Sequence, residues 1–272
     1  MKTTGDIQHG RFSASITATV SFLRGIPFYF RSSPRTPLRV LCLMAFDTLH
    51  VLRSSKRLSK QCLQELATLL DFGACANAFF DSKNFDHQEY RRTRQTLADF
   101  SLGKPVDEYV RKLRELERHR PLPGGDDRSH GDVKTYREEV VRLSLGIVGT
   151  VANDRCSVES GIRQTHHDDG LNMLFRLVMF CQIIDDVLDW PHDLVAGIPS
   201  FTTGHASLSR AIELTRDATV AYRRDVPAAP CLFPLRVALY GLSITTRLML
   251  ATGRLILVSP LVRQNVREVS LR

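Results

Sequence analysis

An apolar stretch in the second half of the chain carries three aspartates at helical spacing. It runs from Phe180 to Trp190 and places Asp185, Asp186 and Asp189 among aliphatic side chains. Residues three and four apart share one face of a helix, so we expect these carboxylates to lie together. Like charges on a largely apolar helix repel one another and lose hydration. This costs free energy unless a cation compensates the charges. Because Mg²⁺ is commonly held by one or two carboxylates together with substrate phosphates, we predict a magnesium site here. The alternative is a solvated acidic patch.

A second polar cluster lies upstream, on another apolar segment. Asn77 and Asp81 are four residues apart, Asp86 follows, and Arg91 and Arg92 lie just beyond. Paired arginine N–H donors are well suited to grip a phosphate. An acid-bearing helix followed by arginines therefore suits a metal-bridged diphosphate, with Asp81 and Asp86 as metal ligands. The alternative is that the two aspartates cap or flank a helix end and the arginines are solvated.

A third segment, 136–152, begins with Tyr136 and contains Gly146 and Gly149 within a helical pattern. A glycine in a helix interior costs about 1 kcal/mol relative to alanine. The two glycines indicate either close helix packing or room for a bulky apolar ligand.

Composition and charge narrow the class of partner. The 272 residues are 43% hydrophobic and 24% charged, which is typical of a globular protein, and the formal net charge is +8. A positive chain favours an anionic partner or substrate. The basic residues are dispersed, without a long basic block or a stacking-aromatic motif. We therefore expect no nucleic-acid partner.

The cysteines and the apolar stretches indicate in which cellular compartment the protein is expected. Six cysteines without CxxC spacing indicate buried thiols in a reducing compartment, so we expect a cytoplasmic protein. The most apolar stretch, 232–261, is interrupted by Arg236, Arg247 and Arg254, which is unlike a membrane span. Loose association with a membrane face stays open because the stretch is both apolar and basic. A homodimer also stays open.

Helical patterns dominate the chain, and strand signals are scarce. We predict an all-α protein that forms one domain over 1–272, with a Pro/Gly-rich loop near 119–131. Pro191 is expected to end or kink the central helix. The predicted helices span 38–52, 59–80, 87–100, 106–118, 132–153, 170–190, 207–224 and 233–257.

The acidic segment resembles the second aspartate-rich motif of trans-isoprenyl diphosphate synthases. In that family the motif reads approximately Phe-Gln-x-x-Asp-Asp-x-x-Asp, followed by an Asp and a Gly-Lys. Here Gln182 precedes the three aspartates, and Asp193 and Gly197 follow them. The chain around Asp81 looks like the position of the first motif. Residues 136–149 are similar to the Tyr-rich, Gly-containing helix of squalene and phytoene synthases.

The resemblance implies the class I isoprenoid synthase fold, an all-α bundle around a central cavity. It implies a Mg²⁺-dependent prenyltransferase that acts on prenyl diphosphates through an allylic carbocation. The implied metal ligands are Asp185, Asp186, Asp189, Asp81, Asp86 and Asp193, with the first three catalytic. The implied substrate-binding residues are Arg91, Arg92, Gln182, Tyr136 and Asn77.

Departures from the pattern keep other functions open. No complete Asp-Asp-x-x-Asp stands upstream, and Gly197 is followed by Ile198 where the family has lysine. These departures favour a non-catalytic isoprenoid-binding or regulatory protein that keeps the fold. A terpene-cyclase metal triad is only approximated within 153–159, where the glutamate spacing is wrong. A third alternative is an HD-type metal phosphohydrolase that uses His166, His167 and Asp168.

Overall fold

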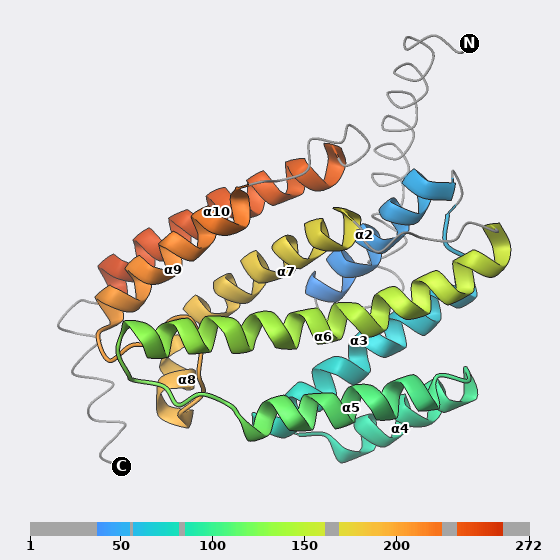
Figure 1. The fold of residues 1–272 in the computed structure, drawn as a ribbon, viewed down its shortest axis with the longest axis horizontal. Helices are drawn as coiled ribbons and strands as arrows, with labels where there is room; N and C mark the ends of the chain where they lie inside the picture. The colour runs from blue at the N-terminus through green and yellow to red at the C-terminus, as the bar shows by residue number, and fades with distance from the viewer. Residues whose placement is uncertain (1–36, 55–56, 82–84, 161–168, 225–232, 258–272) are drawn as a thin grey trace, which may run out of the picture. The chain divides into compact units, whose positions relative to one another are not determined.

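The computed structural model describes residues 37–54, 57–81, 85–160, 169–224 and 233–257. Every regular element in these ranges is an α-helix, which confirms the predicted all-α class (Figure 1). The helices are α2 (Pro37–Ser54), α3 (Lys60–Phe80), α4 (His87–Asp99), α5 (Gly103–Arg118), α6 (Asp127–Ser160), α7 (Asp169–Leu188), α8 (Trp190–Ala196), α9 (Leu208–Arg223) and α10 (Phe233–Leu257).

Polar side chains set several helix starts. The side chains of Ser59 and Asp86 accept hydrogen bonds from backbone N–H groups in the first turns of α3 and α4. Such caps satisfy N–H groups that have no partner within the helix. Asp126 does the same before α6, since its Oδ1 accepts from the Ser129 backbone N–H at 3.0 Å. As a result α6 begins five residues earlier than predicted, and the Pro/Gly-rich connector shortens to 119–126.

The central acidic segment is divided between two helices. The predicted helix 170–190 ends at Leu188, and α8 begins at Trp190 with Pro191 in its first turn. A proline fits the first turn of a helix because the N–H it lacks would have no intrahelical partner there. Gly197 ends α8 with a positive φ of 63°, a conformation that glycine adopts at low cost.

The chain divides into two compact units, and each is made from three stretches of sequence. The first contains 1–112, 143–174 and 227–237, and the second contains 113–142, 175–226 and 238–272. In the first unit α3 packs against both α2 and α4 (Figure 1). The predicted single domain and central cavity stay predictions.

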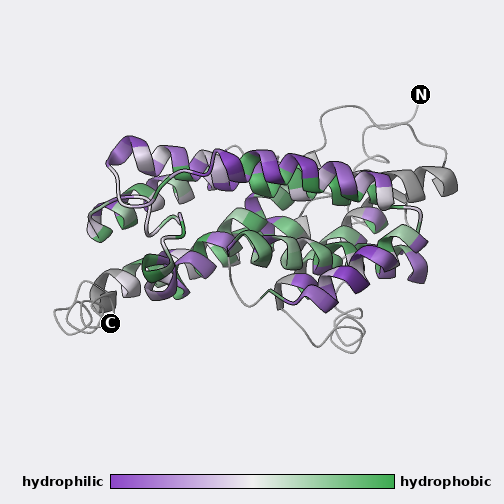
Figure 2. Cartoon of the chain, turned by 90° about the horizontal axis from the view of Figure 1, so that it is seen from below, coloured by the Kyte–Doolittle hydropathy of each residue, from purple (hydrophilic) through white to green (hydrophobic). Residues whose placement is uncertain are grey.

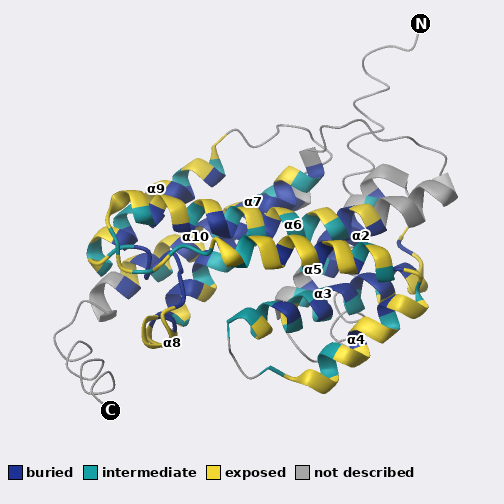
Figure 3. Ribbon diagram, turned by 60° about the horizontal axis from the view of Figure 1, so that its bottom comes forward, coloured by how far each residue is buried: buried dark blue, intermediate teal, exposed yellow. Residues whose placement is uncertain are grey.

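The helices bury one face and expose the other. Figure 2 shows hydrophilic and hydrophobic residues along the same helices, and Figure 3 shows buried and exposed residues alternating in the same way. The largest fully buried side chains include Leu66, Phe72 and Leu97 in the first unit, and Phe180, Ile183, Phe201 and Leu239 in the second. Among the described helices, none combines the length and apolar character needed to cross a membrane.

Candidate functional site

The three aspartates of the acidic segment differ in their environments. Asp185 is exposed, Asp189 is half-buried, and the Asp186 side chain is only 1% exposed. The Asp189 backbone N–H donates to the Asp185 carbonyl at 2.8 Å, and the Asp193 N–H donates to the Asp189 carbonyl at 2.9 Å. The backbone therefore continues in helical turns from α7 into α8. We call residues 185–193 the acidic turn.

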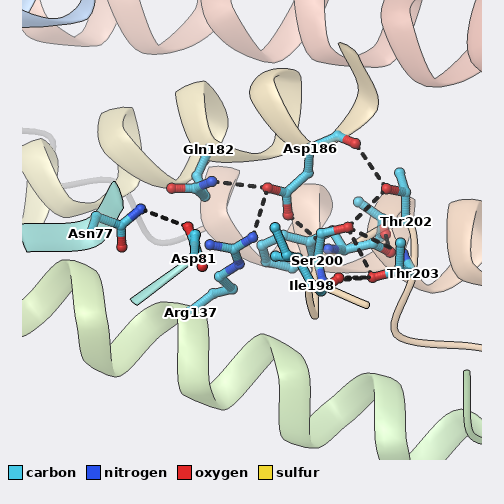
Figure 4. A network of polar contacts seen from close by, with 11 residues as sticks. Asn77, Asp81, Arg137, Gln182, Asp186, Ile198, Ser200, Thr202 and Thr203 are labelled. Carbon is cyan, nitrogen blue, oxygen red and sulfur yellow. Dashed lines mark hydrogen bonds and ion pairs between the residues drawn. The ribbon is translucent and has the colours of Figure 1, made fainter. Parts of the chain in front are cut away.

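The carboxylate of Asp186 lies at the centre of a hydrogen-bond network within the second unit (Figure 4). Its Oδ1 accepts from Gln182 Nε2 at 2.9 Å and from the Arg137 guanidinium at 3.2 Å. Its Oδ2 accepts from the backbone N–H of Phe201 at 2.7 Å. The buried charge is thus compensated by one cation and two neutral donors, which is the condition for keeping a carboxylate in the interior.

The Asp186 network fastens a segment that follows α8, residues 198–206. The Thr202 hydroxyl donates to the Asp186 backbone carbonyl at 2.8 Å, and the Thr203 hydroxyl donates to the Ile198 carbonyl at 2.7 Å. The Ser200 hydroxyl lies 3.1 Å from the hydroxyls of both threonines. Figure 4 shows these side chains gathered beside Asp186. Asp186 therefore connects the end of α7 to the segment that follows the acidic turn.

Segment 198–206 is also tied to the start of α6. The Gly124 N–H donates to the Thr203 carbonyl, and the Ala206 N–H donates to the Gly125 carbonyl, each at 2.8 Å. His130 is 2% exposed, and its Nε2 lies 3.1 Å from the Phe201 carbonyl oxygen. Desolvation by burial lowers the pKa of this imidazole below its ordinary 6.5. The segment is thus held by α7 and by both sides of the α6 start.

The upstream polar cluster belongs to the first unit. Asn77 Nδ2 donates to Asp81 Oδ2 at 3.1 Å, and Asp81 occupies the C-terminal cap position of α3 (Figure 4). Asp86 Oδ1 accepts from the N–H groups of Gln88 and Glu89 at the start of α4. Both carboxylates therefore lie at helix ends. Their predicted part in metal binding stays a prediction, as does a pairing with the acidic turn of the other unit.

The predicted phosphate-binding arginines lie on α4. Arg91 and Arg92 are both exposed, and Arg92 forms an ion pair with Glu89 at 2.7 Å. The hydrogen bond from Arg92 to Glu89 is the main reason that the pKa of this guanidinium is raised. Arg94 pairs with Asp107 on α5, also at 2.7 Å. A surface pair of this kind is weak and can be exchanged for a stronger anion.

Tyr136 is buried, and its hydroxyl donates to Glu117 at 2.6 Å. Burial, and then this hydrogen bond, raise the pKa of the phenol. Asp193 lies in the first turn of α8 and is 2% exposed. Tyr136 and Asp193 are thus buried within the second unit, whereas Gln182 is half-buried there. The predicted ligand contacts of all three residues stay predictions.

Several residues of the Asp186 network were not predicted from the sequence: Arg137, Ser200, Phe201, Thr202, Thr203 and His130. One signal could have indicated Arg137. An aspartate in an apolar helix needs a cation nearby, and Arg137 is an early basic residue of the 136–152 segment. The hydroxyls of 200–203 gave no comparable signal.

Within the described residues, no three His, Cys, Asp or Glu side chains come together as a group that could hold a metal ion. His166, His167 and Asp168, the residues of the phosphohydrolase alternative, lie outside the described residues. So do the side chains of the approximate cyclase triad at 153–159. Comparisons with known proteins found no matching family model and no significantly similar curated protein or solved structure.

Proposed function

We propose that this protein is a Mg²⁺-dependent enzyme of the class I isoprenoid synthase type that acts on prenyl diphosphates. The observation that carries the proposal is the division of roles within the acidic turn. Asp186 is buried and held by Arg137, while Asp185 is exposed and Asp189 is half-buried. A fixed turn with accessible carboxylates suits the binding of a cation together with an anionic ligand.

Exposed aliphatic side chains occur in and beside the same turn. Leu188 is 61% exposed, Leu194 is 43% exposed and Val195 is 58% exposed. Leu188 directly precedes Asp189, and the other two directly follow Asp193. Carboxylates next to exposed aliphatic groups suit a ligand with an anionic head and an apolar tail. A prenyl diphosphate has this character.

The donor set fits magnesium in its chemistry. Asp185 and Asp189 offer hard carboxylate oxygens, and Mg²⁺ often takes only one or two carboxylates and completes its coordination with water and substrate phosphate. When bound, the metal would supply charge stabilisation for a leaving diphosphate. We assign Asp186 a different role, because its oxygens already accept hydrogen bonds from Gln182, Arg137 and Phe201. It positions the two neighbouring ligands.

The proposed reaction begins with cleavage of the bond between the prenyl C1 and the diphosphate oxygen. The electron pair leaves with the diphosphate, and an allylic cation remains. A second prenyl alkene, or a double bond of the same chain, then supplies electrons to the cation, and loss of a proton completes the product. Arg91 and Arg92 are exposed cations that could bind diphosphate oxygens. The net charge of +8 favours the encounter with a polyanionic substrate.

A second function is favoured by a specific observation: a non-catalytic isoprenoid-binding protein with the same fold. Asp81 and Asp86 lie at helix ends, and the Asp86 carboxylate accepts from two backbone N–H groups there. Ile198, which stands where the family has lysine, is buried and cannot contact a phosphate by charge. A single acidic turn could bind a diphosphate without cleaving it.

The test is incubation of the purified protein with Mg²⁺ and C5 to C20 prenyl diphosphates, with products identified by mass spectrometry. We expect a longer or cyclised product that is lost in Asp185→Asn. The matched control is Asp217→Asn, which removes an exposed aspartate from α9. This control should keep full activity.

Thermal melting separates the two candidate functions. If Mg²⁺ with a prenyl diphosphate raises the melting temperature but no product forms, the binding protein is the better conclusion. If neither a product nor a shift in melting is seen, or if Asp185→Asn keeps wild-type activity, the assignment of the acidic turn is wrong.

A further inference from the structure

The outward face of α10 carries large apolar side chains at helical spacing. Val237, Tyr240, Ile244 and Leu248 follow one another at intervals of three or four residues and are 54%, 44%, 61% and 63% exposed. Residues at these intervals lie on one face of a helix. We call these four residues the α10 stripe. A continuous stripe is more informative than the same number of scattered exposed side chains.

The buried face of the same helix contains polar side chains. Ser243 is 2% exposed and Thr246 is fully buried, with the Thr246 hydroxyl donating to the Leu242 carbonyl at 2.8 Å. Leu239 and Leu250 are buried as well. A helix that faces water usually places its hydroxyls outward and its aliphatic side chains inward. Here the hydroxyls of Ser243 and Thr246 are buried while Ile244 and Leu248 are exposed. The exposed face is therefore more apolar than that of a helix that contacts only water.

The charge of this part of the chain identifies the kind of surface that it fits. Helix α10 contains no Asp or Glu. From residue 233 to residue 272, six arginines stand against one acidic residue, Glu268, which gives +5 of the net charge of +8. The arginines are Arg236, Arg247, Arg254, Arg263, Arg267 and Arg272. Apolar side chains combined with arginine are complementary to a surface that is both apolar and anionic.

We propose that the α10 stripe docks this protein on an anionic phospholipid surface. Ile244, Leu248 and Tyr240 enter the boundary between headgroups and acyl chains, and arginines such as the exposed Arg247 bind lipid phosphates. The helix lies on the membrane and does not cross it. The inference is independent of the acidic turn and of any catalytic activity.

The test is cosedimentation of the full chain with vesicles. We expect binding to vesicles of phosphatidylglycerol and phosphatidylcholine, weak binding to phosphatidylcholine alone, and release as the salt concentration rises. The double variant Ile244→Gln/Leu248→Gln should bind about tenfold less strongly or worse, because two large aliphatic side chains no longer leave water. Circular dichroism of the variant checks that it is folded.

A control removes an exposed aliphatic residue elsewhere. Leu122→Gln changes a side chain that is 83% exposed and lies outside α10. It should bind vesicles as the wild type does. If the α10 double variant fails to fold, Arg247→Glu gives a second test, since it leaves the stripe intact and should weaken binding to anionic vesicles about fivefold or more.

Insertion can be read directly with Tyr240→Trp. The one native tryptophan, Trp190, is buried at 6% exposure, so a blue shift in emission on addition of vesicles reports on position 240. The proposal is overturned if the wild type does not bind anionic vesicles or if the α10 double variant binds them as well as the wild type. It is also overturned if the protein is a dimer that the double variant makes monomeric and no lipid is bound, because the stripe would then join two copies.

Discussion

The Arg137 guanidinium donates at 3.2 Å to the Asp186 carboxylate, 49 positions later in the chain, and both side chains are buried. The pair joins α6 to the end of α7 within the second unit. Because Phe201 donates to the other carboxylate oxygen, the same aspartate also holds the segment that follows α8. Asp186, itself a residue of the acidic turn, thus fixes the turn through its bonds to Arg137 and Phe201.

Breaking this ion pair should destabilise the protein strongly. Asp186→Asn leaves the Arg137 charge, on a side chain 10% exposed, without its carboxylate, and we expect a loss of about 3 kcal/mol in the free energy of unfolding. Arg137→Met should cost a similar amount, while the double variant should cost clearly less than the sum. Urea denaturation measures all three. Gln182→Leu, which removes only a neutral donor to the same oxygen, should cost about 1 kcal/mol. Additive losses for Arg137 and Asp186 would show that the two are not coupled.

The parts of this structure that could be predicted from the sequence are the local ones. The helices follow from apolar spacing within a few turns, and the suggestion that Asp86 caps a helix needs only the three residues after it. The early start of α6 was also readable, since Asp126 and Ser129 form a local cap. The role of Asp186 could not be predicted from the sequence, because its partners Arg137 and Phe201 lie 49 and 15 positions away. Tertiary contacts of this kind leave no periodic signal.

His130 should make stability depend on pH. Its pKa is lowered by burial, so between that lowered value and its ordinary 6.5 the unfolded chain binds more protons than the folded one. Stability therefore rises with pH through this window and falls as the pH drops below about 6.5. We expect His130→Gln to reduce this dependence, measured by urea denaturation from pH 5 to pH 7.5. His192→Gln removes an exposed histidine and should follow the wild type. Parallel curves for wild type and His130→Gln would contradict the assignment.

Cys181 should react slowly with alkylating reagents. Burial, with a smaller contribution from the charge of Asp185, raises the pKa of its thiol to about 11. Little thiolate is then present near neutral pH, and the thiolate is the reactive form. Asp185→Asn removes a negative charge and should lower this pKa, increasing the alkylation rate by a factor of about two to ten. The rate is measured by iodoacetamide labelling at pH 8 and peptide mass spectrometry. An unchanged rate at Cys181 would mean that Asp185 does not influence the thiol.

The two glycines of α6 should respond differently to alanine. Gly146 is exposed, and a Cβ there would meet nothing within 4 Å, so Gly146→Ala should raise the free energy of unfolding by about 1 kcal/mol. Gly149 is buried, and a Cβ there would lie 3.3 Å from a methyl carbon of Leu171. Leu171 must shift to admit it, so the gain from helix propensity is offset and Gly149→Ala should be close to neutral or destabilising. Urea denaturation measures the free energy of unfolding of the two variants. Equal gains in this free energy at both positions would show that α6 is not closely packed against Leu171.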